Sequence, residues 1–341
     1  MLRRDAVAQL QVWRDDVLEL DVQHGCGPDD LFWIFSASKP FIGVLVWQLI
    51  ERGQLGLDDP VSAYWPEFAQ GGKQHITVRQ ILTHRSGLPV ASSGPGDVLA
   101  MRDWHRSIRR IETARPRYEP GTDPAYQYVI YGFMLGELVQ RVTGLPLRRV
   151  MDAELLRPLD LTDTRLGLRT VEVPRAVPIT TSGQAGRIAD RLLNASTTRR
   201  AVIPAAGIST TAADLATFYR MLLAGGSLDG GPRILQPATI ERMRAPSAST
   251  ERDRFARSHV RWAHGFQLGG SRPGPKEINP MGQLSSRSTF GHNGSNCCIG
   301  WADPERGLVF AYLTNRFTLG RRDIAHLAAV ADAVIAAADA S

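Results

Sequence analysis

Residues 36–52 restrict the fold more than any other segment, because their apolar side chains lie almost all round a helix. Such a helix must be buried on every side, so it predicts a central helix with other elements packed around it. Its most apolar stretch, residues 41–50, is too short to span a bilayer. Pro40 is tolerated because it lies in the first turn, and Gly53 ends the helix. The pattern therefore places Ser36 at the N-terminus of a buried helix.

Ser36 begins the tetrapeptide Ser36-Ala37-Ser38-Lys39, and lysine is scarce in this chain. Of the 40 Lys and Arg residues, only Lys39, Lys73 and Lys276 are lysine. A lysine can lose its proton when its surroundings lower its pKa, whereas an arginine cannot. Lys39 lies one turn after Ser36 on the same face, where the positive end of the helix dipole helps to lower both pKa values. The pair is a candidate nucleophile and base, although a structural lysine in a first helical turn explains the tetrapeptide equally well.

The composition indicates a globular protein of one large domain or two smaller ones. The 341 residues are 43% hydrophobic and 22% charged, and three cysteines are too few and too irregular for a disulfide framework or a zinc site. The formal charge is +6, but the arginines occur in short pairs among acidic neighbours, without a nucleic-acid motif. We therefore expect a reduced, cytoplasmic protein with no signal peptide, membrane span, metal, cofactor or nucleic-acid partner. Cys297 and Cys298 are expected to be small buried strand residues.

The order of the expected elements indicates a sheet domain interrupted by helices. Strands are expected at residues 7–13, 17–22, 262–268, 289–292, 297–302 and 308–315. Helices are expected at residues 78–84, 128–142, 147–156, 212–223, 237–243 and 324–338, and residues 171–195 are expected to be rich in loops. The predicted class is α+β: residues 1–54 and 195–341 form a discontinuous sheet domain, residues 55–194 form a helical domain, and the active site lies at their interface.

Two further segments carry side chains suited to acyl transfer. Tyr126 and Tyr128 follow Pro120-Gly121-Thr122 at a predicted loop-to-helix junction, where a nearby ammonium can lower the pKa of a tyrosine and make it a proton shuttle. His292 precedes Gly294 at a predicted strand edge, where glycine lets a substrate approach the backbone closely. Taken alone, each is more simply a structural residue, namely a packed tyrosine at a helix start and a strand residue before a turn.

In this order, the three segments resemble the serine β-lactamase and penicillin-binding-protein superfamily, and most of all its class C β-lactamase-like branch with the family VIII carboxylesterases. The likeness runs from about residue 7 to 335 and is carried by residues 35–41, 76–89, 119–126, 158–164, 290–294 and 302–305. It implies a β-lactamase/transpeptidase-like fold, with an antiparallel sheet flanked by helices and a mostly helical insertion. It also implies that Ser36 is the acylated nucleophile, Lys39 its base and Tyr126 the proton relay.

The resemblance assigns binding groups as well. His292 falls where penicillin-recognising members carry the lysine of Lys-Thr-Gly, and Gly294 completes the His-x-Gly of many esterase-like members. The oxyanion hole would be formed by the backbone N–H groups of Ser36 and Ser295. The walls of the pocket are expected to come from Trp33, Tyr128, residues 89–97 and the loop before residue 289.

Two departures from the family pattern matter. Tyr128 stands where the family has the asparagine that binds the amide side chain of β-lactams and orients the lysine. A phenol there favours esters of small or apolar acyl groups. The helix that usually precedes the first strand is absent. Either the true start lies upstream, or the sheet face near residues 324–338 is less covered and mediates homo-oligomer formation.

We therefore expect a serine hydrolase that cleaves small-molecule esters or amides through a Ser36 acyl-enzyme. The chain contains no Gly-x-Ser-x-Gly elbow and no His-Glu-x-x-His motif, so an α/β-hydrolase esterase and a zinc hydrolase lack support. The alternatives are a β-lactamase or D-alanyl-D-alanine carboxypeptidase, and an acyltransferase of the same family. A catalytically silent scaffold protein is the alternative from a different class.

Overall fold

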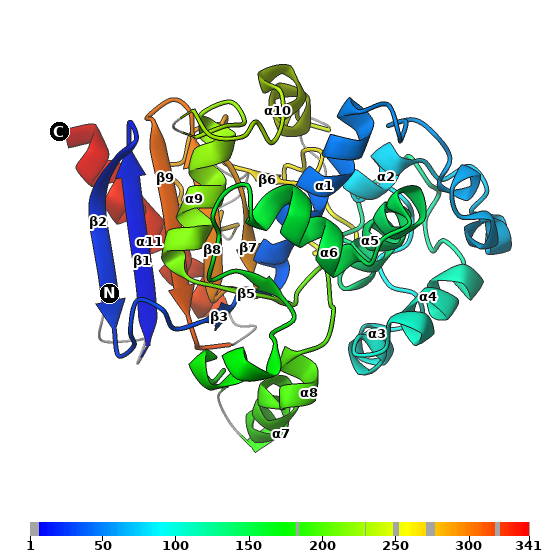
Figure 1. Ribbon diagram of the computed structural model, residues 1–341, viewed down its shortest axis with the longest axis horizontal. Coiled ribbons are helices and arrows are strands. Elements are labelled where there is room, and N and C mark those ends of the chain that lie inside the picture. The colour runs from blue at the N-terminus through cyan, green and yellow to red at the C-terminus, as the bar shows by residue number, and fades with distance from the viewer. Residues whose placement is uncertain are drawn as a thin grey trace.

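The computed structural model describes residues 7–181, 184–228, 230–247, 252–270, 277–317 and 321–340. Its main sheet has six antiparallel strands in the order β2-β1-β9-β8-β7-β6. These strands are β1 (Ala8–Arg14), β2 (Val17–His24), β6 (Gln267–Leu268), β7 (Phe290–Gly294), β8 (Cys298–Asp303) and β9 (Leu308–Thr314). The N-terminal hairpin pairs with β9, so the two ends of the chain build one sheet (Figure 1).

Helices cover both faces of this sheet (Figure 1). Helix α9 (Ala212–Leu223) packs on one face and α11 (Arg321–Ala340) on the other. Strand β9 is buried along its whole length, because its alternate side chains belong to two cores. Phe310 and Tyr312 pack with residues of α11, whereas Ala311 and Leu313 belong to the core that contains α9.

The outer strand β2 is the least covered part of the sheet. Val17, Leu18 and Leu20 are exposed apolar side chains on this edge strand. Self-association near this end of the molecule stays a prediction, as does a cytoplasmic location. Within the ranges given above, no helix combines the length and the apolar character needed to cross a membrane.

The apolar segment that begins at Ser36 forms the predicted central helix. A short 3-10 turn, η1 (Phe35–Ser38), leads into α1 (Lys39–Glu51), which is buried along residues 39–49. Helix α1 packs against strand β7 and against α5 (Ile130–Thr143). The chain between α1 and α5 forms η2 (Val61–Ala63), η3 (Pro66–Gly72), α2 (Val78–Leu82), α3 (Gly94–Ala100) and α4 (Trp104–Thr113), and after α5 come α6 (Leu147–Met151) and the π-helical turn Asp152–Leu156.

Helices therefore gather on one side of α1 and the sheet lies on the other, which confirms the predicted α+β class (Figure 1). The division of the chain near residues 54 and 194 into two domains stays a prediction. A second, three-stranded sheet has the order β3-β5-β4. Its strands are β3 (Phe32–Trp33), β4 (Arg165–Leu166) and β5 (Ile208–Thr210), and two further helices are α8 (Ser196–Arg199) and α10 (Pro237–Arg244).

Two predicted elements differ from the structure. Residues 171–195 contain the 3-10 helix η5 (Thr170–Arg175) and the helix α7 (Gln184–Asn194) rather than mostly loop. The apolar residues Ile188, Ala189, Leu192 and Leu193 recur at helical spacing, so the sequence carries a signal for α7 that the loop prediction overlooked. The strand predicted at residues 262–268 is paired in regular ladder form only at β6, because Gly265 has a φ of 116° and turns the chain.

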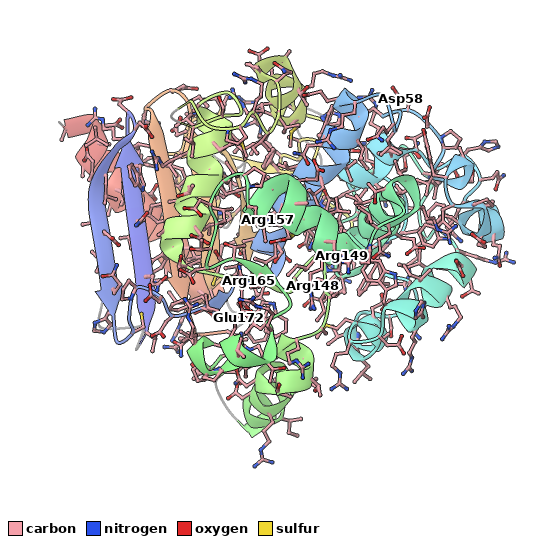
Figure 2. All side chains as sticks on the ribbon, viewed as in Figure 1. Asp58, Arg148, Arg149, Arg157, Arg165 and Glu172 are labelled. Atoms are coloured by element: carbon pink, nitrogen blue, oxygen red, sulfur yellow. The ribbon has the colours of Figure 1, made fainter. Side chains whose placement is uncertain are left out.

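Many arginine side chains lie on the surface over α6 and β4, as Figure 2 shows for Arg148, Arg149, Arg157 and Arg165. Arg165 Nε donates to Glu172 at 2.7 Å, and Arg157 pairs with Asp152 at 3.1 Å. Arg148 donates to the carbonyl oxygen of Leu166 at 2.9 Å. The arginines in this region are therefore largely engaged with the chain itself, as the acidic neighbours in the sequence suggest.

Candidate active site

The backbone around Ser36 is held in an uncommon conformation. Phe35 has a φ of 47°, in the left-handed region, and its ring stacks on the rings of Trp33 and Phe317. Strained residues of this kind gather at functional sites, where packing holds them in place. Ser36 follows at the start of the turn into α1, with a side chain that is 7% exposed, and Lys39 is 1% exposed. The helix thus presents both groups from its buried N-terminal turn.

The side chains of Ser36, Lys39 and Tyr126 form a closed triangle. Lys39 Nζ lies 3.1 Å from Ser36 Oγ and 2.8 Å from the hydroxyl of Tyr126. The same hydroxyl lies 2.7 Å from Ser36 Oγ. The structure therefore brings together the three residues that the sequence singled out for acyl transfer.

Burial decides the charges in this triangle. Desolvation lowers the pKa of Lys39 well below its ordinary value, so the amine can be neutral at moderate pH. Burial raises the pKa of Tyr126, so its phenol stays protonated. The lowered tyrosine pKa expected from a nearby ammonium is not what the structure gives, because desolvation by burial raises the pKa of Tyr126 more than its hydrogen bond with Ser36 lowers it. A neutral amine and a neutral phenol are the protonation states that can accept and donate a proton, respectively.

The end of strand β7 lies directly against the turn that carries Ser36. A Cβ at Gly294 would collide with the carbonyl oxygen of Ile34 and come within 3.2 Å of the backbone nitrogen of Ala37. Only glycine fits this backbone-to-backbone contact. Ser295 then turns the chain away with a φ of 49°. The backbone of Ser295 is therefore next to that of Ser36, as an oxyanion hole of these two N–H groups requires.

His292, on the same strand, is a neutral hydrogen-bond acceptor. Its Nδ1 lies 2.7 Å from the carbonyl oxygen of Asn293, so Nδ1 carries the proton and Nε2 carries a lone pair. Within the described part of the chain, Nε2 is buried without a hydrogen-bond partner. Burial and the nearby Lys39 lower the pKa of His292 to about 3. His292 therefore offers the larger cavity an uncharged hydrogen-bond acceptor.

Two cavities meet at Ser36. The larger, of about 380 Å³, is lined by Tyr126, Trp262, His292 and residues of the segment 255–260. The smaller, of about 160 Å³, has apolar walls from Trp33, Phe35, Val98, Met101, Leu192, Leu193 and Phe317. Ser36, Tyr128 and Ser295 line both, so Tyr128 is a wall between the two spaces.

The predicted pocket walls are partly correct. Trp33 and Tyr128 line the cavities, and Pro280 represents the loop before residue 289. The smaller cavity is lined by Val98 and Met101 rather than by residues 89–97, because α3 begins at Gly94 and turns its later residues inward. Cys297 and Cys298 are both buried, as expected; Cys298 begins β8, whereas Cys297 lies in the turn just before that strand.

Three residues near the triangle were not identified from the sequence. The ring of Trp262 lies parallel to that of Tyr126, with centroids 5.4 Å apart. His84 has a φ of 59° and packs its buried ring against both Tyr126 and Trp262. Asp253 is fully buried and accepts the backbone N–H of Tyr126 at 3.1 Å. His84 lies in the family-like stretch 76–89, which was a usable signal, whereas Asp253 stands in a polar run that resembles any surface loop.

The described part of the site contains no set of side chains suited to bind a metal ion. Across the ranges of the chain that the structure describes, no three His, Cys, Asp or Glu side chains are close enough together to hold a metal ion. The site is built from a hydroxyl, an amine, a phenol and backbone amides.

Comparisons with known proteins agree with this geometry. The Beta-lactamase family model matches residues 5–335. The esterase/β-lactamase LipL of Mycobacterium tuberculosis is 28% identical over 315 residues, which cover 83% of this chain and 68% of LipL. A penicillin-binding-protein homolog from Caulobacter crescentus has a TM-score of 0.80 and 26% identity, covering 97% of this chain and 92% of that one. EstA from Arthrobacter nitroguajacolicus has a TM-score of 0.80 and 25% identity, covering 98% of this chain and 94% of that one. The predicted resemblance and fold are confirmed, and the chain belongs to the β-lactamase family of serine hydrolases.

Proposed function

We propose that this protein is a carboxylesterase that cleaves esters of small or apolar acyl groups through an acyl-enzyme on Ser36. The observation that carries the proposal is the closed triangle of Ser36, Lys39 and Tyr126, whose three distances lie between 2.7 and 3.1 Å. A buried neutral amine beside a serine hydroxyl is an activated nucleophile of the kind that covalent catalysis requires.

In the first step, Ser36 Oγ attacks the ester carbonyl carbon and its proton passes to Lys39 Nζ, directly or through the hydroxyl of Tyr126. The N–H groups of Ser36 and Ser295 stabilise the resulting oxyanion, and each donor of this kind contributes about 3 kcal/mol. Tyr126 then gives its proton to the leaving alkoxide oxygen and takes one from the Lys39 ammonium. The C–O bond to the alcohol breaks, and the acyl group remains on Ser36.

In the second step, water attacks the acyl carbonyl carbon and the same groups act in reverse. Tyr126 and Lys39 take the proton of the water, and Ser36 Oγ recovers a proton as it leaves. The carboxylic acid departs and the triangle returns to its starting state. An alcohol or amine that replaces the water gives the acyltransferase alternative, with the same balance of atoms.

The two cavities support an assignment of the two halves of the ester. Tyr126 lines only the larger cavity, so the leaving alcohol, which must receive its proton, belongs there. The acyl group then belongs in the smaller, apolar cavity. At about 160 Å³, that cavity is close to the size of an engineered protein cavity that binds benzene. We therefore expect acyl groups of up to about six carbon atoms.

The charge of the site favours neutral esters over β-lactams and D-alanyl-D-alanine peptides. Both of those substrates carry a carboxylate, and a buried carboxylate needs a cation or several donors near it. His292 is neutral, with its pKa lowered to about 3, and its Nε2 is an acceptor. Tyr128 also fills the place of the asparagine that would bind an amide side chain. The β-lactamase and peptidase alternatives therefore have weaker support than the esterase.

A substrate panel tests the proposal. Initial rates would be measured on p-nitrophenyl esters from acetate to decanoate, on nitrocefin and on a D-alanyl-D-alanine peptide, with Ser36→Ala as the control. We expect a maximum at or below the hexanoate, little turnover of the other two substrates, and an acyl adduct on the peptide that contains Ser36 in intact and digested mass spectra. Nitrocefin turnover equal to ester turnover would favour the β-lactamase, and transfer to added alcohols in preference to water would favour the acyltransferase. Wild-type turnover in Ser36→Ala would refute the nucleophile.

A further inference from the structure

A buried carboxylate lies behind the catalytic triangle, and the mechanism above does not use it. Asp253 is fully buried. None of its hydrogen-bond partners in the described part of the chain carries a charge, although a buried carboxylate is costly unless it is well compensated. It lies inside the wall of the larger cavity and not in a surface ion pair, which suggests that it has a specific role.

Both oxygens of Asp253 accept hydrogen bonds. One oxygen accepts the backbone N–H groups of Tyr126 at 3.1 Å, Phe255 at 2.9 Å and Ala256 at 2.7 Å. The other accepts the indole N–H of Trp262 at 3.0 Å. The carboxylate therefore ties together the backbone that carries Tyr126, the cavity wall at residues 255–256, and Trp262.

Trp262 in turn fixes the ring of Tyr126. The two rings are parallel within 4°, with centroids 5.4 Å apart. The edge of Trp262 also meets His84 at 4.3 Å between centroids. Asp253 thus restrains Tyr126 twice, through its backbone N–H and through the aromatic surface on which its ring lies.

We propose that Asp253 is a positioning residue, which holds Tyr126 and Trp262 so that the Tyr126 hydroxyl reaches both Ser36 and Lys39. The hydroxyl lies at the far end of a long side chain, so a small change at the backbone of Tyr126 displaces it by more. Such a displacement would break its contacts with Ser36 Oγ at 2.7 Å and Lys39 Nζ at 2.8 Å. A displacement of about 1 Å in a catalytic group can cost about 100-fold in rate. The inference rests on the proposed role of Tyr126 in acyl transfer.

The arrangement needs a carboxylate and not merely a polar side chain. Four N–H donors point at Asp253, and a carboxylate has two oxygens that both accept. An amide has only one acceptor oxygen, so its NH₂ group would face either the indole N–H or the backbone N–H groups. Donor would then oppose donor, in a buried place where an unmet hydrogen bond is expensive.

The test compares Asp253→Asn with a matched control at a carboxylate that pairs with the neighbouring residue Arg254. Arg254 directly follows Asp253 and forms an ion pair with the half-exposed Asp123. Asp123→Asn removes this ion pair and changes no residue of the catalytic triangle. Ester hydrolysis would be measured per active site, with the sites counted by the burst from a p-nitrophenyl phosphonate. We expect Asp253→Asn to lower kcat about 30-fold with KM changed less than threefold. Asp123→Asn should stay within twofold of the wild type.

The conservative change Trp262→Phe keeps an aromatic ring on Tyr126 and removes the indole donor. Combined with Asp253→Asn, it removes the opposition between the new NH₂ group and the indole. We therefore expect the double variant to lose less in kcat than the product of the two single losses, which a merely structural role would not produce. If Asp253→Asn fails to fold, Trp262→Phe alone decides, with an expected loss of about fivefold in kcat per titrated site.

A kcat per titrated site within twofold of wild type for Asp253→Asn, or for Trp262→Phe where that variant decides, overturns the proposal. A lower melting temperature and fewer active sites of normal kcat also overturn it, because they indicate a role in stability alone. The proposed function is tested separately by Ser36→Ala and Tyr126→Phe. If either of these retains wild-type turnover, the acyl-transfer mechanism fails; if both lose activity as expected and Asp253→Asn is fully active, only the positioning role fails.

Discussion

The chain buries two of its lysines, Lys39 and Lys73, in surroundings that give them opposite characters. Both are at most 1% exposed. Lys73 Nζ donates to the carbonyl oxygens of Gln70, Glu112 and Ala114, so each of the three protons of its ammonium has an acceptor. Lys39 Nζ instead contacts two hydroxyls, which can donate as well as accept, and a carbonyl oxygen at 3.4 Å. Burial alone therefore does not make a lysine a base; the chemistry of its neighbours does.

The pKa values follow the neighbours. Burial lowers the pKa of Lys73 only to about 8, and the nearby Glu112 opposes the decrease, so the ammonium remains charged at neutral pH. Burial lowers the pKa of Lys39 well below its ordinary value, with desolvation as the cause. Lys73 is thus a structural cation that donates hydrogen bonds to three backbone carbonyl oxygens, whereas Lys39 is suited to exchange a proton with Ser36. The third lysine, Lys276, lies outside the described residues.

The largest expected difference between the two lysines is in catalysis. Lys39→Arg keeps the charge and the approximate reach but removes an amine that can be neutral. We expect kcat for a p-nitrophenyl ester to fall at least about 1,000-fold, because a general base contributes about 100-fold to 10,000-fold. Lys73→Met should leave kcat per titrated active site within twofold. Equal losses in the two variants would break the distinction between a catalytic and a structural lysine.

The next effect separates the two tyrosines near Lys39. Tyr126→Phe removes the hydroxyl that joins Ser36 to Lys39, and we expect kcat to fall about 100-fold with little change in KM. Tyr128→Phe is the matched control, because it keeps the ring that separates the two cavities and removes only a hydroxyl. It should stay within about threefold of wild type in steady-state assays. A larger loss for Tyr128→Phe than for Tyr126→Phe would assign the proton relay to Tyr128.

Site residues could be predicted from the sequence where their role depends on neighbours close in the chain, and not where it depends on distant ones. The central helix and the spacing of Ser36 and Lys39 are local, so an apolar period and a tetrapeptide were enough. Tyr126 and His292 became candidates only through their order in a family-like pattern. Asp253 could not be predicted, because its proposed role depends on a hydrogen bond from Tyr126, which lies 127 positions away along the chain.

The same limit applies to the fold. The hairpin, strand β9 and helix α9 were predicted from local sequence patterns, and in the structure Thr211 caps α9. Helix α7 was missed although its apolar residues recur at helical spacing, whereas the short pairing of β6 depends on the turn at Gly265. The scarcity of lysine marked Lys39 and Lys73 alike, and only the acceptors around each amine distinguish them. Composition could raise the question of a titratable lysine but could not answer it.

A smaller effect concerns stability. In Lys73→Met three buried carbonyls lose their donor, and we expect the free energy of unfolding at pH 7 to fall by about 2 kcal/mol. The pKa of Lys73 in the folded protein, about 8, lies below its ordinary value of 10.5. The unfolded chain therefore binds a proton between these pH values that the folded chain has lost, so the stability of the wild type contains a contribution that rises with pH in this window. Denaturant unfolding at pH 7 and pH 10 would show that the variant lacks this rise; an equal rise in both proteins would contradict the assignment.

The smallest effect is a pH dependence that asks which lysine controls the rate. If neutral Lys39 is the base, kcat/KM for a neutral ester should rise with pH through the pKa of Lys39, which burial holds well below 10.5, and then reach a plateau. The groups around it do not interfere above neutral pH, because burial also lowers the pKa of His84 and brings that of His292 to about 3, while the pKa of Tyr126 is raised. The profile would be measured from pH 5 to 9, with spontaneous hydrolysis subtracted, in the wild type and in Lys73→Met. We expect the two curves to coincide in shape. A step near pH 8 that disappears in Lys73→Met would show that the rate follows the titration of Lys73, and would refute the role of Lys39 as the base.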